Sequence, residues 1–190
     1  MKAVFCLGLY IFIIAGVLSG QSLDLTNKVK LRPVTGTKFS LARLSTNKVS
    51  ALIFYSPECP ICNALIKTVR DMADSFAMQG VKFYLIYPGS YYSLSNLRKF
   101  QKSYLLKSEG FRDDNNELVK VLGATVMPQV FVIDSAGNIV YSGKIDNSYE
   151  GIGRRRSFIT EFYLKDALNA VLRHSELKIK RTEPAGCFIN

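Results

Sequence analysis

The amino-acid sequence predicts an α/β protein with a mixed central β-sheet and helices on both of its faces. Short apolar runs of strand length alternate with segments whose apolar residues recur at helical spacing. The elements follow the order strand, helix, strand, helix, strand, strand, helix, and the last two strands form a hairpin. Crossover units followed by a hairpin produce a sheet with parallel and antiparallel pairs, covered by helices on both sides.

The first half of the chain supplies two strands and the helix between them. Residues 49–55 form an apolar and aromatic run that predicts a buried strand. The first helix is expected over residues 59–79 and is stopped by Gly80. A second strand is expected over residues 81–87, where the chain then meets Pro88.

Two helices and a polar segment follow. Ser93 can cap a helix that runs to about residue 106. The polar segment 111–116 is expected to lead into a short helix at 117–122.

The remaining elements complete the sheet and one face of the molecule. Residues 129–133 and 139–143 read as the two strands of a hairpin, with its turn at 134–138. Residues 159–172 have the apolar spacing of an amphipathic helix. The tail alternates at 177–179 like an edge strand.

The N-terminus has the pattern of a targeting signal. One lysine precedes residues 3–20, which are uncharged and rich in large apolar side chains, as in a cleaved signal peptide or an N-terminal membrane anchor. Either one exports the rest of the chain. Residues 21–190 then form one domain, whose N-terminal extension at 21–48 contains one or two short strands near 29–31 and 39–41.

The chain is basic, with a formal net charge of +10. Its lysines and arginines are scattered, and the densest run is residues 154–156. A solvated basic face near anionic lipid or an acidic partner fits this pattern better than a nucleic-acid site, because the chain is expected to be exported.

The chemistry is expected at Cys59 and Cys62. These two thiols lie where a strand turns into a helix. The unpaired amides of a helix N-terminus favour a thiolate at the first cysteine, and the second lies one turn along, within reach of a disulfide. A C-x-x-C pair outside the cytoplasm also meets an oxidising compartment.

Two other interpretations of the pair are weaker. Zinc needs about four ligands, and outside the pair the chain offers only His174, Cys187 and Cys6. A purely structural disulfide would stabilise little, because so short a loop restricts the unfolded chain only slightly.

A second motif completes a resemblance to a known family. Val126-Met127-Pro128 stands directly before the strand Gln-Val-Phe-Val-Ile, and the hairpin Gly-Asn-Ile-Val-Tyr-Ser-Gly follows. Together with the strand–C-x-x-C–helix unit, over residues 38–172, they resemble the thioredoxin superfamily, and most closely its exported TlpA/ResA-like and redoxin-domain members.

The resemblance implies a thioredoxin-like three-layer sandwich with Pro128 in cis beside the dithiol. It also implies that the backbone of Met127 is free to pair with an extended substrate. Glu58 departs from the family, which often has tryptophan before the first cysteine, and its carboxylate opposes the helix terminus in setting the pKa of Cys59.

Two related site patterns are missing. The peroxiredoxin pattern Pro-x-x-x-Thr/Ser-x-x-Cys is absent, since Pro57 stands two residues before Cys59. A Sco-type copper chaperone would have C-x-x-x-C and a downstream histidine, whereas His174 falls at the end of the last expected helix.

These observations predict an exported thiol–disulfide oxidoreductase that needs no dissociable cofactor. An exposed Cys59 attacks the disulfide of a partner protein, and Cys62 resolves the mixed disulfide. A redox partner recycles the dithiol, and the net direction as reductant, oxidant or isomerase stays open. The alternatives are a copper(I)-handling protein and a non-catalytic thioredoxin-like module. The third exported thiol, Cys187, is expected to lie far from the pair.

Overall fold

The computed structural model describes residues 22–24, 26, 28–35 and 37–190. The expected signal peptide or anchor at residues 1–20 lies outside the described residues. The described chain forms a mixed six-stranded sheet. Its spatial order is β1 (Arg32–Pro33), β4 (Glu109–Asp113), β3 (Val81–Pro88), β2 (Val49–Phe54), β6 (Gln129–Asp134) and β7 (Ile139–Gly143).

The position of β2 near the centre of the sheet explains its composition. Every residue of β2 is buried, because both faces of the strand are covered. It pairs in parallel with β3 and antiparallel with β6, and β6 continues antiparallel into β7. The predicted mixed sheet and its hairpin are therefore confirmed.

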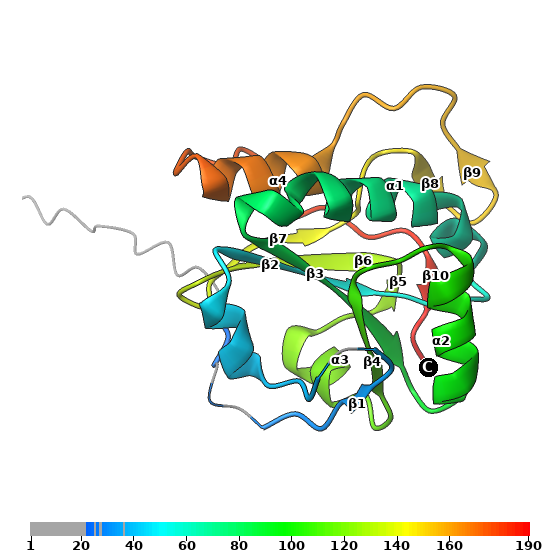
Figure 1. The fold of residues 1–190 in the computed structure, drawn as a ribbon. Coiled ribbons are helices and arrows are strands. Elements are labelled where there is room, and N and C mark those ends of the chain that lie inside the picture. Colours follow the sequence, from blue (N-terminus) through cyan, green and yellow to red (C-terminus); the bar gives the residue numbers. More distant parts are fainter. Residues whose placement is uncertain (1–21, 25, 27, 36) are drawn as a thin grey trace, which may run out of the picture.

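Helices cover both faces of the sheet (Figure 1). On one face lie α1 (Pro60–Phe76) and α4 (Tyr163–Leu172), and α2 (Leu94–Ser103) packs into the same hydrophobic cluster. On the other face lie α3 (Glu117–Leu122) and the 3-10 helix η1 (Leu41–Thr46). A short 3-10 turn, η2 (Ala77–Gln79), follows α1 and ends at Gly80, as the sequence predicted.

The last helix is shorter than predicted, because α4 begins at Tyr163 and not at residue 159. The amide groups of Thr160 and Glu161 donate to the side-chain oxygen of Asn147, and the carbonyl oxygen of Glu161 accepts from the Asn147 amide. These contacts hold residues 160–161 in an extended connection, so the helical spacing there does not produce a helix.

A strand lies where the sequence predicted only a polar segment. Residues 109–113 form β4, which pairs in parallel with β3 and antiparallel with β1. The buried carboxylate of Asp113 at the end of β4 accepts hydrogen bonds from the amides of Glu117, Leu118 and Val119. It thus supplies partners for the first turn of α3, which explains a charged residue inside the sheet.

The N-terminal extension contains one short strand, but not where it was expected. β1 covers Arg32–Pro33, and the segment expected to form a strand near residues 39–41 instead leads into η1. Between β7 and α4, β8 (Tyr149–Gly151) and β9 (Arg154–Arg155) form a small antiparallel ribbon.

The C-terminal tail crosses the molecule differently from the prediction. Residues 177–179 form no strand; instead Arg181 makes a parallel bridge with Ser142 of β7. The chain then reaches β10 (Cys187–Phe188), which pairs antiparallel with β5 (Val126–Met127). The tail therefore ends beside the loop that precedes β6.

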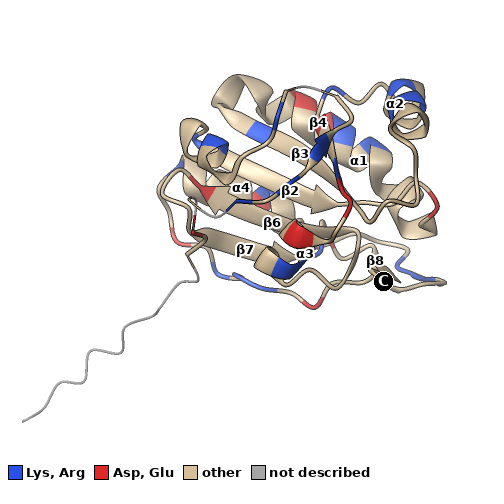
Figure 2. Cartoon of the chain, turned by 90° about the horizontal axis from the view of Figure 1, so that it is seen from below, with Lys and Arg blue, Asp and Glu red and all other residues tan. Residues whose placement is uncertain are grey.

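Charged side chains are spread over the molecule (Figure 2). Lysines and arginines occur on several elements, including α2 and β4, with acidic residues between them. None of the helices in the described part of the chain combines the length and apolarity that crossing a membrane requires.

Candidate active site

The C-x-x-C pair lies at the junction of β2 and α1. Cys59 is the N-cap residue of α1, Pro60 occupies the first turn, and Cys62 follows within that turn. Proline is well tolerated there, because the first amides of a helix have no partner inside the helix. The side-chain amide of Asn63 donates to the carbonyl oxygen of Pro57 at 2.8 Å and fixes the loop before the helix.

Both thiols of the pair are buried. Cys59 is only 2% exposed and Cys62 is fully covered. The expectation that Cys59 is exposed is therefore wrong for this state of the molecule, because the C-terminal tail lies against it. The cysteines in the described chain are free thiols.

The surroundings of Cys59 and Cys62 shift the pKa values of the two thiols in opposite directions. Hydrogen bonding from the Cys62 thiol, and after it from Cys187, lowers the pKa of Cys59 to about 5, although burial opposes this. Cys59 makes no side-chain capping hydrogen bond in the described chain, but the backbone amide of Cys62 still helps to lower its pKa. Burial raises the pKa of Cys62 well above its usual value.

The competition expected at Cys59 is thereby decided. The pKa of Cys59 is lowered by its hydrogen-bond partners, although the carboxylate of Glu58 is adjacent in the sequence. Cys59 is therefore the more acidic thiol of the pair, and Cys62 keeps its proton at neutral pH.

The peptide bond between Met127 and Pro128 is cis, as predicted. The loop also lies against the dithiol: the protonated Cys59 Sγ donates to the carbonyl oxygen of Met127 at 3.0 Å. The predicted proximity of this loop to Cys59 is confirmed.

Cys187 is not distant from the pair. Its sulfur lies 2.7 Å from the sulfur of Cys59, to which it donates a hydrogen bond. The expectation of a remote Cys187 is wrong, because β10 pairs with β5 and carries residue 187 across the site. Burial, followed by the nearby Cys59, raises the pKa of Cys187 to about 12.

The backbone of Met127 is not free either. Cys187 stands directly opposite Met127 in the antiparallel pair of β10 and β5. A methyl group on Gly186 would overlap the carbonyl oxygen of Met127, so this close approach requires glycine. The expected substrate-pairing edge is thus covered by the chain's own C-terminus.

Several tyrosines near the pair were not expected from the sequence. The hydroxyls of Tyr55 and Tyr87 are buried and lack a hydrogen-bond partner among the described residues. Burial raises the pKa of both, and Cys62 adds to the effect on each. The Tyr92 hydroxyl lies 3.2 Å from Ser56 Oγ, in the loop before Cys59. The available signal was that Tyr55 and Tyr87 each end an apolar run.

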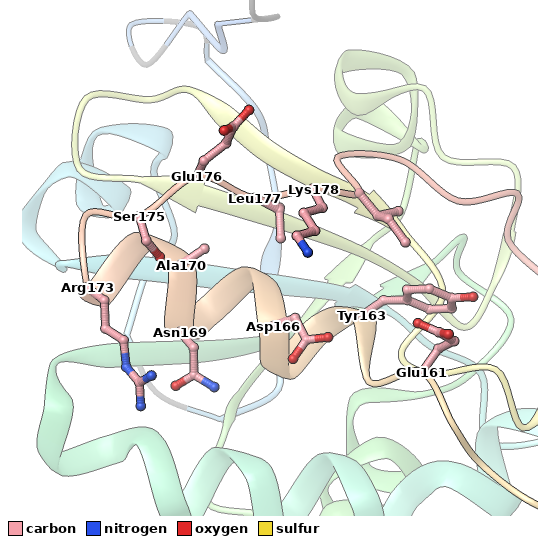
Figure 3. Close-up of a pocket in the computed structure, with 11 residues that line it drawn as sticks. Glu161, Tyr163, Asp166, Asn169, Ala170, Arg173, Ser175, Glu176, Leu177 and Lys178 are labelled. Atoms are coloured by element: carbon pink, nitrogen blue, oxygen red, sulfur yellow. The ribbon is translucent and has the colours of Figure 1, made fainter.

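Several surface hollows lie away from the thiols. Figure 3 shows one of about 380 Å³ between α4 and the segment after it, lined by residues such as Asp166, Arg173 and Lys178. It includes none of the site cysteines. Within the described residues, no three cysteine, histidine, aspartate or glutamate side chains are grouped as a metal site.

Comparisons with solved structures identify the fold. A hypothetical protein from Sinorhizobium meliloti is 23% identical, with a TM-score of 0.76 over 89% of this chain and 93% of that one. An uncharacterised conserved protein from Geobacillus kaustophilus is 21% identical, with a TM-score of 0.78 over 90% and 92%. A secreted Mycobacterium tuberculosis disulfide oxidoreductase is 17% identical, with a TM-score of 0.54 over 76% and 93%.

No curated protein matches the sequence. The predicted thioredoxin-like fold is nevertheless confirmed, since the structural neighbours include a thioredoxin-like protein and a thiol:disulfide interchange protein. A family model with the description AhpC/TSA family matches residues 24–142, more than half of the chain. The chain therefore belongs to the AhpC/TSA family.

Proposed function

We propose that this protein is an exported thiol–disulfide oxidoreductase that exchanges disulfides with partner proteins through Cys59 and Cys62. One observation carries the proposal. A thiol of low pKa begins α1, and a second, buried thiol of raised pKa lies one helical turn further on. This asymmetry gives one cysteine the role of nucleophile and the other the role of resolving thiol.

The exchange takes place in two steps. The Cys59 thiolate attacks one sulfur of the partner's disulfide, and the other partner sulfur leaves as a thiolate. Cys62 then loses its proton and attacks Cys59 Sγ, which releases the second partner sulfur and leaves a Cys59–Cys62 disulfide. The partner gains two electrons and the dithiol loses two, so a separate redox partner must reduce the pair again.

The environment of Cys62 favours this order. Part of the rise in the pKa of Cys62 comes from the hydrogen bond and the charge of Cys59. Once Cys59 is held in a mixed disulfide it carries no charge, and Cys62 becomes easier to deprotonate. The resolving thiol is therefore activated only after the first step.

Met127 and Pro128 are the proposed docking residues for the partner's main chain. β5 lies beside the nucleophile, and β10 is the strand that pairs with it. When β10 leaves, the backbone groups of Met127 become available for an extended segment of the partner.

Dithiol exchange fits the site better than peroxide reduction. Ser56 does stand three positions before Cys59, where the peroxiredoxin pattern has its hydroxyl residue. Leu52, however, occupies the position of the pattern's proline. A resolving cysteine three residues after the nucleophile also supplies all that dithiol exchange requires.

Export rests on residues 1–20, with one lysine before a long uncharged run. The structurally similar Mycobacterium tuberculosis disulfide oxidoreductase is a secreted protein. N-terminal sequencing of exported protein tests this part: a start near Gln21 indicates a cleaved signal peptide, and intact Met1 in membranes indicates an anchor. Recovery of the protein only from the cytoplasm would disprove export.

Two cysteine substitutions test the chemistry. Cys59→Ser is expected to abolish the reduction of insulin disulfides, because it removes the nucleophile. Cys62→Ser is expected to accumulate mixed disulfides with partner proteins, because it removes the resolving thiol. Full activity in Cys59→Ser would refute the mechanism.

A further inference from the structure

The C-terminal tail brings a third thiol into the candidate active site. Cys187 Sγ lies 2.7 Å from Cys59 Sγ, and its backbone is in antiparallel register with Met127. An extended segment that pairs with β5 and presents a sulfur to Cys59 has the placement proposed above for a partner protein in a mixed disulfide.

The tail is held on both sides of the site. On the N-terminal side of Cys187, the Thr182 amide donates to the carbonyl oxygen of Ser142 at 3.0 Å, and Thr182 Oγ1 accepts from the Lys144 amide at 2.8 Å. On the C-terminal side of Cys187, the Ile189 amide donates to the carbonyl oxygen of Thr125 at 3.0 Å. These contacts fix the register of Cys187 relative to the dithiol.

Two glycines permit the close approach. A side chain at Gly143 would overlap Thr182, and one at Gly186 would overlap the carbonyl group of Met127. Gly143 also has a φ of 140°, which favours glycine. The tail therefore packs closely against the backbone at Gly143 and at Met127 because no side chain intervenes at either glycine.

The docked tail covers the nucleophile. A cavity of only about 10 Å³ remains next to Pro128, and Ala185 of the tail forms part of its wall. Cys59 is 2% exposed under this cover. A partner disulfide can reach the nucleophile only when the tail moves away.

We propose that residues 186–189 are an internal substrate of the dithiol, with Cys187 as its third redox residue. The inference rests on the proposed function. In the oxidised protein, the Cys187 thiol loses its proton and attacks Cys59 Sγ. A Cys59–Cys187 disulfide forms, the Cys59–Cys62 bond breaks, and Cys62 leaves as a thiolate that takes up a proton. One disulfide replaces another, so no external oxidant or reductant is consumed.

The charge balance of the site supports this exchange. In the reduced protein, Cys187 is a thiol that donates to Cys59, and the nearby Cys59 contributes to its raised pKa. In the Cys59–Cys62 disulfide that negative charge is absent, which makes Cys187 easier to deprotonate. Deprotonation of Cys187 is thus easier in the oxidation state in which its target is present.

The exchange closes the site covalently. In the Cys59–Cys187 form, the tail is tied over β5 and partner proteins are excluded. Attack by Cys62 on Cys59 reverses the bond and frees the tail. Access for partners therefore depends on which of the two disulfides is present.

Disulfide mapping of the full chain tests the proposal. On a Cys6→Ser background, Cys62→Ser leaves Cys59 and Cys187 as the remaining cysteines. After oxidation with glutathione disulfide, the mass of the monomer is expected to fall by that of two hydrogen atoms. Proteolysis is then expected to yield a crosslinked peptide that joins Cys59 and Cys187. The same background with Cys62 retained is expected to yield both Cys59–Cys62 and Cys59–Cys187 peptides.

A glycine substitution tests whether docking of the tail drives the bond. Gly186→Ala is expected to lower the rate of Cys59–Cys187 formation roughly tenfold or more, because displacing a reacting group by about 1 Å can cost up to ~100-fold. Glu183→Ala is the matched control, since the exposed Glu183 side chain lies in the same segment. It is expected to leave that rate within about twofold.

The outcomes separate this inference from the proposed function. If Cys62→Ser carries only glutathione on Cys59 and free Cys187, while the Cys62-containing protein forms Cys59–Cys62 and reduces insulin, the internal substrate is refuted and the proposed function stands. If Gly186→Ala and Glu183→Ala crosslink equally fast, docking is refuted. If Cys59–Cys187 forms but insulin is never reduced, the proposed function fails and the tail chemistry remains.

Discussion

Cys59 is surrounded by groups that stabilise its thiolate. The thiols of Cys62 and Cys187 hydrogen-bond to it, and the backbone amide of Cys62 adds to their effect. When Cys59 is ionised, it keeps the hydrogen bond from Cys187 and gives up its donation to the Met127 carbonyl oxygen. The nucleophile thus owes its acidity to residues from two distant parts of the chain.

The reactivity of Cys59 should follow its pKa of about 5. The rate of its alkylation by iodoacetamide in the reduced protein is expected to rise through an inflection near pH 5 and then level off, because the thiolate is the nucleophile. Since folding lowers this pKa, the reduced native state should also gain stability from pH 5 towards 9 and lose it as the pH falls through 5. An inflection near the ordinary thiol value of 9.0 would contradict this.

Removing the Cys187 donor should weaken the thiolate. Cys187→Ala is expected to raise the pKa of Cys59, because one of the hydrogen bonds that lower it is lost. The inflection of the alkylation profile should move to higher pH, while Glu183→Ala should leave it in place. An unchanged inflection in Cys187→Ala would show that Cys187 has no part in this acidity.

At the scale of elements, the start of α4 is decided by Asn147. This buried side chain accepts from the amides of Thr160 and Glu161 and donates to Thr160 Oγ1 at 2.8 Å. The amide of Leu164 then donates to the carbonyl oxygen of Ile145. The Asn147 side chain thereby holds the end of the extended connection at residues 160–161, and α4 then packs against β6 and β7.

Asn147→Ala is expected to lower the free energy of unfolding by about 1–3 kcal/mol, because it leaves buried polar groups without partners. Urea denaturation measures the change. The control is Asn169→Ala within α4, where alanine is a better helix former and the cost should be close to zero. Equal stability of the two variants would show that Asn147 does not fix the connection.

At the scale of the whole molecule, the sheet separates the described core into two clusters. Leu168 of α4 is fully buried in the cluster that also contains α1. Leu118 of α3 is fully buried in the cluster on the opposite face. The two clusters therefore pack against opposite faces of the same strands.

Leu168→Ala and Leu118→Ala are each expected to cost about 2–5 kcal/mol, since each leaves a cavity in a packed core. The two costs should add within about 0.5 kcal/mol, because the sheet keeps the sites apart. Thermal or urea unfolding of the single and double variants tests this. Met78→Ala, at a position that is 96% exposed, should change stability by less than about 0.5 kcal/mol. A large coupling energy would argue against two separate clusters.

The sequence by itself determined the features that depend on neighbouring residues. The apolar run of β2 and the C-x-x-C at the start of α1 predicted the fold and the dithiol, whereas the cis-proline loop at Met127–Pro128 was implied by the family resemblance. The patterns of β2 and α1 are local, because hydrophobic periodicity and helix-end signals depend on residues that are close together in the sequence.

Only the tertiary structure decided how the C-terminus uses these features. Cys187 is separated from Cys59 by 128 positions, and no periodicity in the tail indicates which edge its two-residue strand will join. That choice depends on the open edge of β5 and on the space above Gly143 and beside the Met127 carbonyl group. Backbone pairing between distant segments depends on which strand edges and spaces are left after the core has packed. The burial of Cys59 and the position of Cys187 beside it therefore became visible only in the folded molecule.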